Sequence, residues 1–178
     1  MSPNDWNREY SEGIWDFLKD PKEVAHYAVT AAMVHHFSDS DLILDVACGE
    51  GVLQQYLRPW GYGSYLGIDK SPAAIDKALA RKDDRTSFMV ADGEHFTPSH
   101  RFSCIIFSEC LYYFSEPNRV IQHYANWLVK AGVMVTSIYA SHESENTSIK
   151  TDSLMLLEET TIINARGAWK CAVFSKKA

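Results

Sequence analysis

The sequence has little cysteine, no long apolar run and no excess of positive charge. No stretch approaches the length that spans a membrane, and residues 1–6 lack a basic region followed by an apolar run. The four cysteines lack the two-residue spacing of zinc ligands and lie among apolar or small residues, so we expect structural thiols at Cys48, Cys104, Cys110 and Cys171. These absences together predict a cytoplasmic protein in a reducing compartment.

The charge balance argues against polyanionic partners. The 178 residues include 17 Lys and Arg against 23 Asp and Glu, which gives a formal net charge of -6. Nucleic acids and anionic membranes favour a basic surface, so we expect neither as a partner. Hydrophobic residues make up 46% and charged residues 22%, which is typical of a globular protein, and the length suits one domain.

Among the features that are present, residues 42–53 stand out. An apolar run that contains Asp45 leads into Ala47-Cys48-Gly49-Glu50-Gly51, after which apolar residues recur at helical spacing at Leu53, Tyr56, Leu57 and Trp60. The pattern predicts a strand, a tight loop and the start of a helix. Glycine lets the chain turn sharply and lets a ligand approach the backbone, and a helix start leaves N–H groups unpaired. Taken alone, two glycines after a strand more often form just a turn.

Two later strand ends favour a ligand over a simple turn. Residues 65–68 lead into Asp69, 24 residues after Asp45, and residues 87–91 lead into Asp92, a further 23 residues on. An acidic residue at the end of the second strand, about 20 residues after a glycine-rich turn, binds the ribose hydroxyls of adenosine ligands. The spacing therefore predicts an adenosine site.

The rest of the chain predicts an α/β fold. Asp20 and Pro21 predict a helix over residues 21–37, and further apolar strands at residues 102–107 and 133–139 alternate with helices, which is typical of a parallel sheet. Near the C-terminus we expect a polar loop over residues 142–151 and a short helix over residues 153–159. A hairpin of residues 160–165 and 168–175 is expected to follow.

Three segments resemble the nucleotide-binding motifs of class I S-adenosylmethionine (SAM)-dependent methyltransferases, and they are residues 44–51, 67–71 and 90–94. The resemblance spans residues 42–139. The chain is also loosely similar to small bacterial nodulation N-methyltransferases. The resemblance implies a Rossmann-like doubly wound sheet, mostly parallel, with an antiparallel C-terminal hairpin strand. The chain is expected to form a single domain, residues 1–178, with an N-terminal arm and helix, residues 1–38, on a core of residues 39–178. Two interpretations of the arm stay open: its aromatic side chains pack on the domain, or, as the resemblance implies, they close as a lid over the cofactor.

The same resemblance implies a site for SAM and its product S-adenosylhomocysteine (SAH). Asp45 and Gly49 would line the methionine end, Asp69 would bind the ribose hydroxyls and Asp92 would bind the adenine amino group. Ala47 replaces the first glycine that many members have, and we expect it to keep a negative φ. The full implied set is Tyr10 as lid, Asp45, Ala47, Gly49, Asp69, Lys70, Asp92, Gly93, Glu94 and Ser108.

The catalytic candidates follow the fourth strand, where α/β sheets place ligand-binding loops. Glu109 and Tyr112 can orient or deprotonate an acceptor, although tyrosines often serve only as walls of a pocket. Histidines are also available as bases, but a surface or structural duty is favoured for each of His26, His95 and His142. We predict no metal, because residues 116–118 do not reproduce the ligands of the magnesium-dependent catechol group.

We therefore predict a SAM-dependent methyltransferase that modifies an oxygen or nitrogen of a small molecule, such as a sugar or another natural product. The protein is expected to be a monomer or a homodimer. Two alternatives stay open: a protein that binds SAM without catalysis, and, less favoured, a nicotinamide-dependent oxidoreductase. The fourth-strand loop lacks the Asn/Asp-Pro-Pro-aromatic sequence of DNA amino-methylating enzymes. Only the arm and residues 142–159 are left to form the acceptor site.

Overall fold

The computed structural model describes residues 3–142, 149 and 151–177. Its strands are β1 (Leu42–Val46), β2 (Ser64–Asp69), β3 (Thr86–Val90), β4 (Phe102–Ser108), β5 (Leu128–Tyr139), β6 (Leu154–Asn164) and β7 (Gly167–Lys176). Its α-helices are α1 (Pro3–Ser11), α2 (Val24–Phe37), α3 (Val52–Leu57), α4 (Pro72–Leu79) and α5 (Pro117–Ala125). Short 3-10 helices are η1 (Ile14–Lys19), η2 (Pro21–Glu23), η3 (Arg58–Trp60), η4 (Leu111–Tyr113) and η5 (Ala140–His142).

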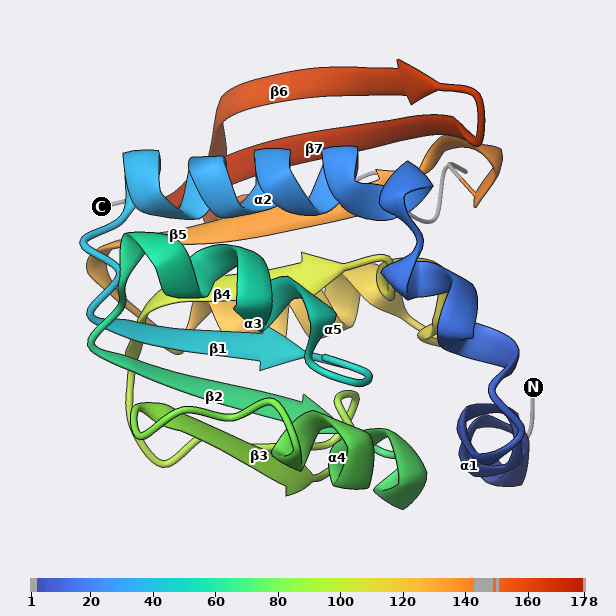
Figure 1. Ribbon diagram of the computed structural model, residues 1–178. Helices are drawn as coiled ribbons and strands as arrows, with labels where there is room; N and C mark the ends of the chain where they lie inside the picture. Colours follow the sequence, from blue (N-terminus) through green and yellow to red (C-terminus); the bar gives the residue numbers. More distant parts are fainter. Residues whose placement is uncertain (1–2, 143–148, 150, 178) are drawn as a thin grey trace.

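The seven strands form one sheet in the order β3-β2-β1-β4-β5-β7-β6 (Figure 1). Strands β1 to β5 are parallel, and β7 lies antiparallel between β5 and β6. The predicted Rossmann-like fold with an antiparallel C-terminal hairpin is therefore confirmed. Chain order reverses between β1 and β4, and ligands of such sheets bind outside the carboxyl ends of the strands at this reversal.

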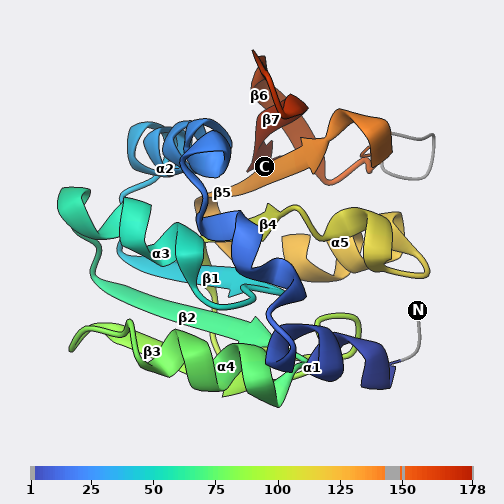
Figure 2. The ribbon, with the colours of Figure 1, turned by 45° about the vertical axis from the view of Figure 1, so that its right-hand side comes forward.

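Helices cover both faces of the parallel part of the sheet. On one face α2 and α3 pack on the strands through residues such as Val34 and Leu57, and on the other face α5 packs through Ile121 and Tyr124 (Figure 2). Strand β4 is buried on both sides, which explains its nearly continuous apolar sequence. Within the described part of the chain, every helix is too short or too polar to cross a lipid bilayer.

The helix predicted over residues 21–37 is confirmed, with its first turn wound as the 3-10 helix η2. The Asp20 carboxylate accepts a hydrogen bond from the backbone N–H of Lys22, as expected of an N-cap. The helix buries His26 and Tyr27 against the sheet, while Val24 is exposed. The segment before it, α1 and η1, which we call the arm, lies across the carboxyl ends of β1 and β2 (Figures 1 and 2).

Two sequence predictions about local structure are wrong. The short helix expected over residues 153–159 is instead the first half of β6, because pairing with β7 along its length overrides the local pattern. Trp60 does not continue the buried face of α3. The α-helix ends at Leu57, Pro59 lies in a tighter 3-10 turn, and Trp60 is 66% exposed. The loop predicted over residues 142–151 lies mostly outside the described residues.

Candidate active site

A cavity of about 270 Å³ lies at the carboxyl ends of β1, β2, β3 and β4, under the arm. Its size is close to the lower end of the range for small-molecule sites. All twelve predicted site residues line it: Tyr10, Asp45, Ala47, Gly49, Asp69, Lys70, Asp92, Gly93, Glu94, Ser108, Glu109 and Tyr112. The fold thus gathers residues that are up to 102 positions apart in the sequence, from Tyr10 to Tyr112, around one space.

The loop after β1 is fixed by its own backbone and by the next strand. The Cys48 N–H donates to the carbonyl of Ile68, and the Gly49 N–H donates to Asp69 Oδ2 at 2.9 Å. Gly49 has φ 54°, where a side chain is strained. A Cβ on Gly49 would also lie 2.6 Å from the Tyr10 hydroxyl oxygen. The glycine therefore serves both the turn and the close approach of the arm.

Ala47 corrects an expectation. Its φ is 57°, in the left-handed region, and not the negative value expected from the sequence. A non-glycine residue adopts this conformation at a cost of roughly 1 kcal/mol, because the Cβ crowds the following carbonyl. The residue lines the cavity all the same.

Asp45 is the most deeply buried of the predicted cofactor residues that carry a charge, with 1% of its surface exposed. Tyr65 donates its hydroxyl to Asp45 Oδ2 at 2.5 Å, while Oδ1 has no hydrogen-bond partner among the described residues. Burial raises the pKa of Asp45 to about 7, the Tyr65 hydrogen bond lowers it and the Asp69 charge raises it. The hydroxyl of Ser108 is likewise buried without a described partner. Both groups line the cavity and can bind donors of a ligand.

Asp69 holds two backbone segments together at the end of β2. Its Oδ2 accepts from Gly49 and its Oδ1 accepts from the Ser71 N–H at 2.8 Å. Burial raises the pKa of Asp69, and these two backbone hydrogen bonds oppose the rise. The carboxylate faces the cavity, so the loop-capping duty and the expected contact with ribose hydroxyls are compatible: each oxygen has a second lone pair.

The third strand end is more open to solvent. The Asp92 carboxylate accepts from the Glu94 N–H at 3.0 Å and from His95 Nδ1 at 2.8 Å. Burial alone would raise the pKa of Asp92, but the His95 hydrogen bond leads the interactions that hold it below the usual value. The Lys70 ammonium lies 5.5 Å from the ring centre of Trp6, so the arm also packs on this side of the cavity.

Glu109 occupies the far side of the cavity, directly after β4. Ser137 donates to its Oε1 at 2.8 Å and Tyr112 donates to its Oε2 at 3.2 Å. Burial raises the pKa of Glu109 to about 7, against the lowering by these hydrogen bonds. None of the described cations forms an ion pair with it, and its φ is 57°. A strained backbone of this kind persists where the surroundings fix it, and it is frequent at functional sites.

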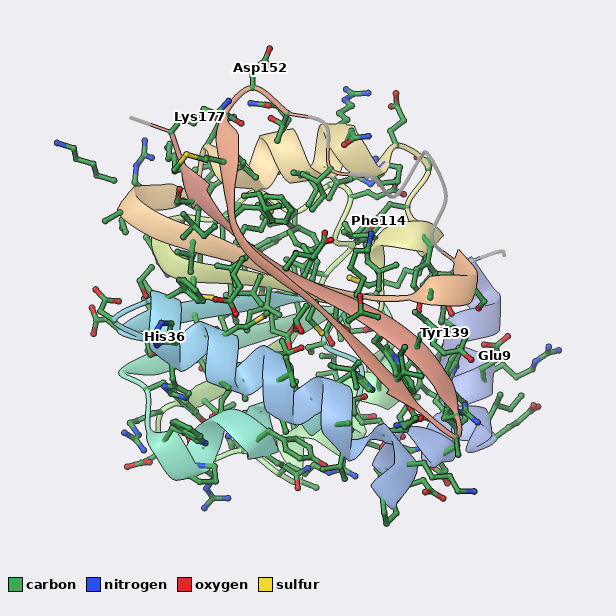
Figure 3. All side chains as sticks on the ribbon, turned by 90° about the horizontal axis from the view of Figure 1, so that it is seen from above. Glu9, His36, Phe114, Tyr139, Asp152 and Lys177 are labelled. Carbon is green, nitrogen blue, oxygen red and sulfur yellow. The ribbon has the colours of Figure 1, made fainter. Side chains whose placement is uncertain are left out.

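The side of the cavity next to Glu109, which we call the acceptor side, has walls that the sequence did not predict. They are Tyr139, Arg166 and Trp169, and they lie with Phe17, Glu23 and Tyr27 from residues 1–38. None of the described residues in the range 142–159 lines the cavity. Tyr139 and Trp169 are opposite each other in the β5–β7 pairing. Figure 3 shows Tyr139 at the same end of the molecule as Glu9 of α1, whereas His36 and Lys177 lie at the other end.

On the acceptor side, residues near the start of α2 contact the tip of the β6–β7 hairpin. Arg166 Nε lies 2.5 Å from Glu23 Oε1, and the guanidinium stacks 4.4 Å above the ring centre of Phe17. The side-chain amide of Asn164 donates to the carbonyl of Lys22 at 2.9 Å. In the sequence, Arg166 lies in the link between the two strands of the predicted hairpin. No local signal marks its partner 143 residues earlier, since Glu23 reads there as part of a helix start.

The comparison with known families decides the identity. A family model described as "Methyltransferase domain" matches residues 14–174. The chain belongs to this family. It is a class I SAM-dependent methyltransferase, as its three motifs predicted. The match covers the arm from η1 onward, the whole sheet up to β7, and every predicted site residue except Tyr10.

Two curated relatives of the methyltransferase are named malonyl-[acyl-carrier protein] O-methyltransferase. That of Magnetococcus marinus is 28% identical over 96 residues, which cover 52% of this chain and 36% of the relative. That of Priestia megaterium is 25% identical over 124 residues, which cover 67% of this chain and 44% of the relative. The chain therefore spans less than half the length of these relatives.

Solved structures share the fold of the methyltransferase over nearly its whole length. The N-methyltransferase NodS from Bradyrhizobium japonicum, in complex with SAH, has a TM-score of 0.82 at 19% identity and covers 98% of both chains. Magnesium protoporphyrin IX methyltransferase from Synechocystis, with bound SAM, has a TM-score of 0.76 at 13% identity and covers 99% of this chain and 98% of its own. The similarity to nodulation N-methyltransferases is thus confirmed at the level of the fold.

The cavity of the methyltransferase has the features that SAM requires. The buried, unpartnered oxygens of Asp45 and Ser108 can accept from an ammonium group, and carboxylates suit a ligand that carries positive charge. Gly93 brings backbone to the wall, since a Cβ there would lie 2.9 Å from Val46. The residues present therefore fit the cofactor.

Neither His26 nor His95 lines the cavity. His26 is fully buried, stacks on Trp169, and has its pKa lowered to about 4 by burial, so it is neutral near pH 7. His95 is exposed and bound to Asp92, and the side chain of His142 lies outside the described residues. Within the described ranges, no three His, Cys, Asp or Glu side chains are grouped so as to hold a metal ion.

Proposed function

We propose that this methyltransferase transfers a methyl group to an oxygen or nitrogen of a small molecule, and that Glu109 accepts the proton of the acceptor. The observation that carries the proposal is the Glu109 carboxylate itself, which lines the cavity without a described cation and has a pKa of about 7. A base is most effective when its pKa lies near the working pH. When bound, SAM supplies an electrophilic methyl group with a neutral thioether as leaving group.

Since the leaving group needs no proton, the protein's task is to orient the acceptor and remove its proton. Tyr112 and Ser137 hold both oxygens of Glu109 and so fix the direction of its free lone pairs. Tyr112 is therefore proposed as a positioning residue. Fixed orientation of this kind contributes roughly 7 to 11 kcal/mol when the geometry is ideal. Burial raises the pKa of Tyr112 far above 10, so its hydroxyl stays protonated and able to donate.

For the cofactor we propose the roles that the motifs imply. Asp45, Ala47, Gly49 and Ser108 would bind the methionine end, and Asp69 would bind the ribose hydroxyls. The exposed strand end would bind the adenine through Lys70, Asp92, Gly93 and Glu94. Tyr10 would close over the site from the arm. These contacts are supported by the lining of one cavity and by the unpartnered oxygens of Asp45 and Ser108.

The walls of the acceptor side favour a ring-containing acceptor, such as a sugar or another natural product. Tyr27, Tyr139 and Trp169 offer flat apolar faces with polar edges, on which the C–H face of a sugar or a planar ring can pack. The names of similar proteins include both kinds of methyl transfer: malonyl-[acyl-carrier protein] O-methyltransferase acts on oxygen, and the N-methyltransferase NodS acts on nitrogen. Residues 1–178 would form one domain, with the arm as its lid.

The test measures transfer of a labelled methyl group from SAM to a panel of amines, sugars and hydroxylated natural products. For the acceptor that is found, Glu109→Gln is expected to lower kcat about 10²- to 10⁴-fold while the dissociation constant for SAH stays the same. Glu116→Gln, an exposed carboxylate paired with Arg119 outside the cavity, serves as the matched control. Full activity of Glu109→Gln would refute the base, and no labelled product from any panel would favour a protein that binds SAM without catalysis.

A further inference from the structure

Glu50 is a buried charge in the cofactor loop that the proposed function does not use. It lies between Gly49 and Gly51, and only 3% of its surface is exposed. Its Oε1 lies 2.8 Å from the Lys77 ammonium, and its Oε2 lies 2.9 Å from the Lys19 ammonium and 3.4 Å from the Arg81 guanidinium. An ordinary turn does not need a buried carboxylate. Here three cations compensate the cost of removing the Glu50 charge from water.

These cations come from two different parts of the chain. Lys77 and Arg81 belong to α4 and the turn that follows it, whereas Lys19 is the last residue of η1 in the arm. Arg81 also donates to the Glu50 carbonyl at 3.0 Å, so α4 holds both the backbone and the side chain of this loop residue. Burial alone would raise the pKa of Glu50, but hydrogen bonds from Lys77 and Lys19 lower it below the usual value. Glu50 therefore stays ionised near pH 7.

The same network fastens the arm in two further places. Lys77 donates to the carbonyl of Tyr10 at 2.6 Å, and Asp16 lies 2.6 Å from the Lys19 ammonium and 3.6 Å from that of Lys77. The arm contributes Trp6, Tyr10 and Trp15 to the lining of the cavity. Breaking the contact of Lys19 with Glu50 would therefore loosen the wall that faces the cofactor loop.

We propose that Glu50 is a positioning residue that latches the arm, through Lys19, onto the loop that binds the cofactor. Glu50 is joined by one peptide bond to Gly49, whose N–H bonds the Asp69 carboxylate. Closing of the arm and ordering of the cofactor loop are thereby coupled. The latch holds the bound ligand by slowing its release, since the arm has to separate from the loop before a ligand under Tyr10 can leave.

The test compares release of SAH from the full-length wild type with release from Lys19→Met. This change removes the arm's contact and leaves Lys77 and Arg81 to neutralise Glu50. Dissociation of SAH, followed by stopped-flow tryptophan fluorescence, is expected to be about two- to fivefold faster, as for the loss of one partly exposed ion pair. Lys19→Arg is expected to restore the slow rate. Lys22→Met is the matched control, since this exposed lysine lies in η2, three residues after Lys19, and forms no ion pair with a described residue.

Salt dependence separates a latch from a merely structural contact. In the wild type and in Lys22→Met, release of SAH is expected to accelerate about threefold when NaCl is raised from about 0.05 to about 0.5 M, because salt screens exposed charges. In Lys19→Met this acceleration is expected to be lost. An unchanged release rate in Lys19→Met would overturn the proposal. A Lys19→Met variant that only melts at a lower temperature without ligand, and whose SAH release keeps the wild-type salt dependence, would also overturn it. Failure of the wild type to bind SAH would instead overturn the cofactor site on which the latch depends.

Discussion

The proposed contact of Asp45 with the methionine end of SAM predicts that cofactor binding depends on pH around neutrality. Burial raises the pKa of this carboxyl to about 7, with a lowering by Tyr65 and a raising by Asp69. A cationic ligand binds better to the ionised form, so binding releases a proton when the pH lies below the pKa. At pH 6 about one tenth of such a group is ionised, so affinity should fall about tenfold from pH 8 to pH 6, or about 1.4 kcal/mol.

The hydroxyl and thiol groups around Asp45 do not titrate between pH 6 and pH 8, so the pH dependence of binding comes from carboxyl groups. The hydroxyls of Tyr65 and Tyr10 and the thiol of Cys48 have raised pKa values, mainly because of burial, and stay neutral at pH 6 to 8. Asp69, from β2, also has a pKa raised by burial. Glu109 titrates near pH 7 on the acceptor side and provides the second contribution.

Calorimetry of SAM binding in two buffers of different ionisation enthalpy at pH 6.5 would count the protons released. Asp45→Asn keeps the hydrogen bond from Tyr65 and removes the charge, so the proton release and most of the tenfold pH effect should disappear. Because the folded pKa of Asp45 is raised, the stability that the carboxyl contributes is present below its unfolded pKa and is lost as pH rises through about 7. Asp45→Asn should therefore stabilise the ligand-free protein at pH 8 by about 1 to 3 kcal/mol. A wild-type affinity that stays constant from pH 6 to pH 8 would refute the reasoning.

Two further changes test the loop at the same end of the sheet. Ala47→Gly should raise the free energy of unfolding by up to about 1 kcal/mol in urea titrations, because φ 57° favours glycine; a loss of stability would show that the strain is absent. Asp69→Asn should weaken SAH binding by about 1.5 to 3 kcal/mol, since it removes one charged acceptor for a ribose hydroxyl. Both changes alter the loop as well: Asp69→Ala frees the N–H groups of Gly49 and Ser71, and Asp69→Asn keeps an acceptor for only one of them, so the melting temperature of the ligand-free variant is measured beside binding. Affinity retained in Asp69→Asn, measured by calorimetry, would rule out the ribose contact.

The cofactor half of the site could be predicted from the sequence because its signals are local. Each of Asp45, Asp69 and Asp92 follows or ends a short apolar run, and parallel strands bring their carboxyl ends to one edge without further information. The backbone of non-glycine residues could not be predicted in the same way. Ala47 and Glu109 both have positive φ, which the surrounding structure imposes and which no residue pattern indicates.

The acceptor half depends on long-range pairing, and this is why the sequence did not place it. Tyr139 and Trp169 become neighbours only because β7 inserts between β5 and β6. Residues 153–159 have apolar spacing that also suits a helix, and only their pairing with β7 makes them a strand. Arg166 reaches Glu23 across 143 residues. Composition and periodicity carry no record of such contacts.

The charges in the cavity form a pattern that the separate residues do not reveal. Seven carboxylates line it. Among the described residues, Glu23, Glu50 and Asp92 each form an ion pair with an Arg, Lys or His side chain, and Glu94 accepts from Ser115. The other three, Asp45, Asp69 and Glu109, form no ion pair with a described cation. Removing unpaired carboxylates from water costs free energy, which shows in the raised pKa values of the other three. A ligand that carries both a sulfonium and an ammonium group relieves this cost, and a thioether product relieves less of it. We therefore expect the cavity to bind the methyl donor more tightly than the spent product, and calorimetry with both ligands would measure the difference.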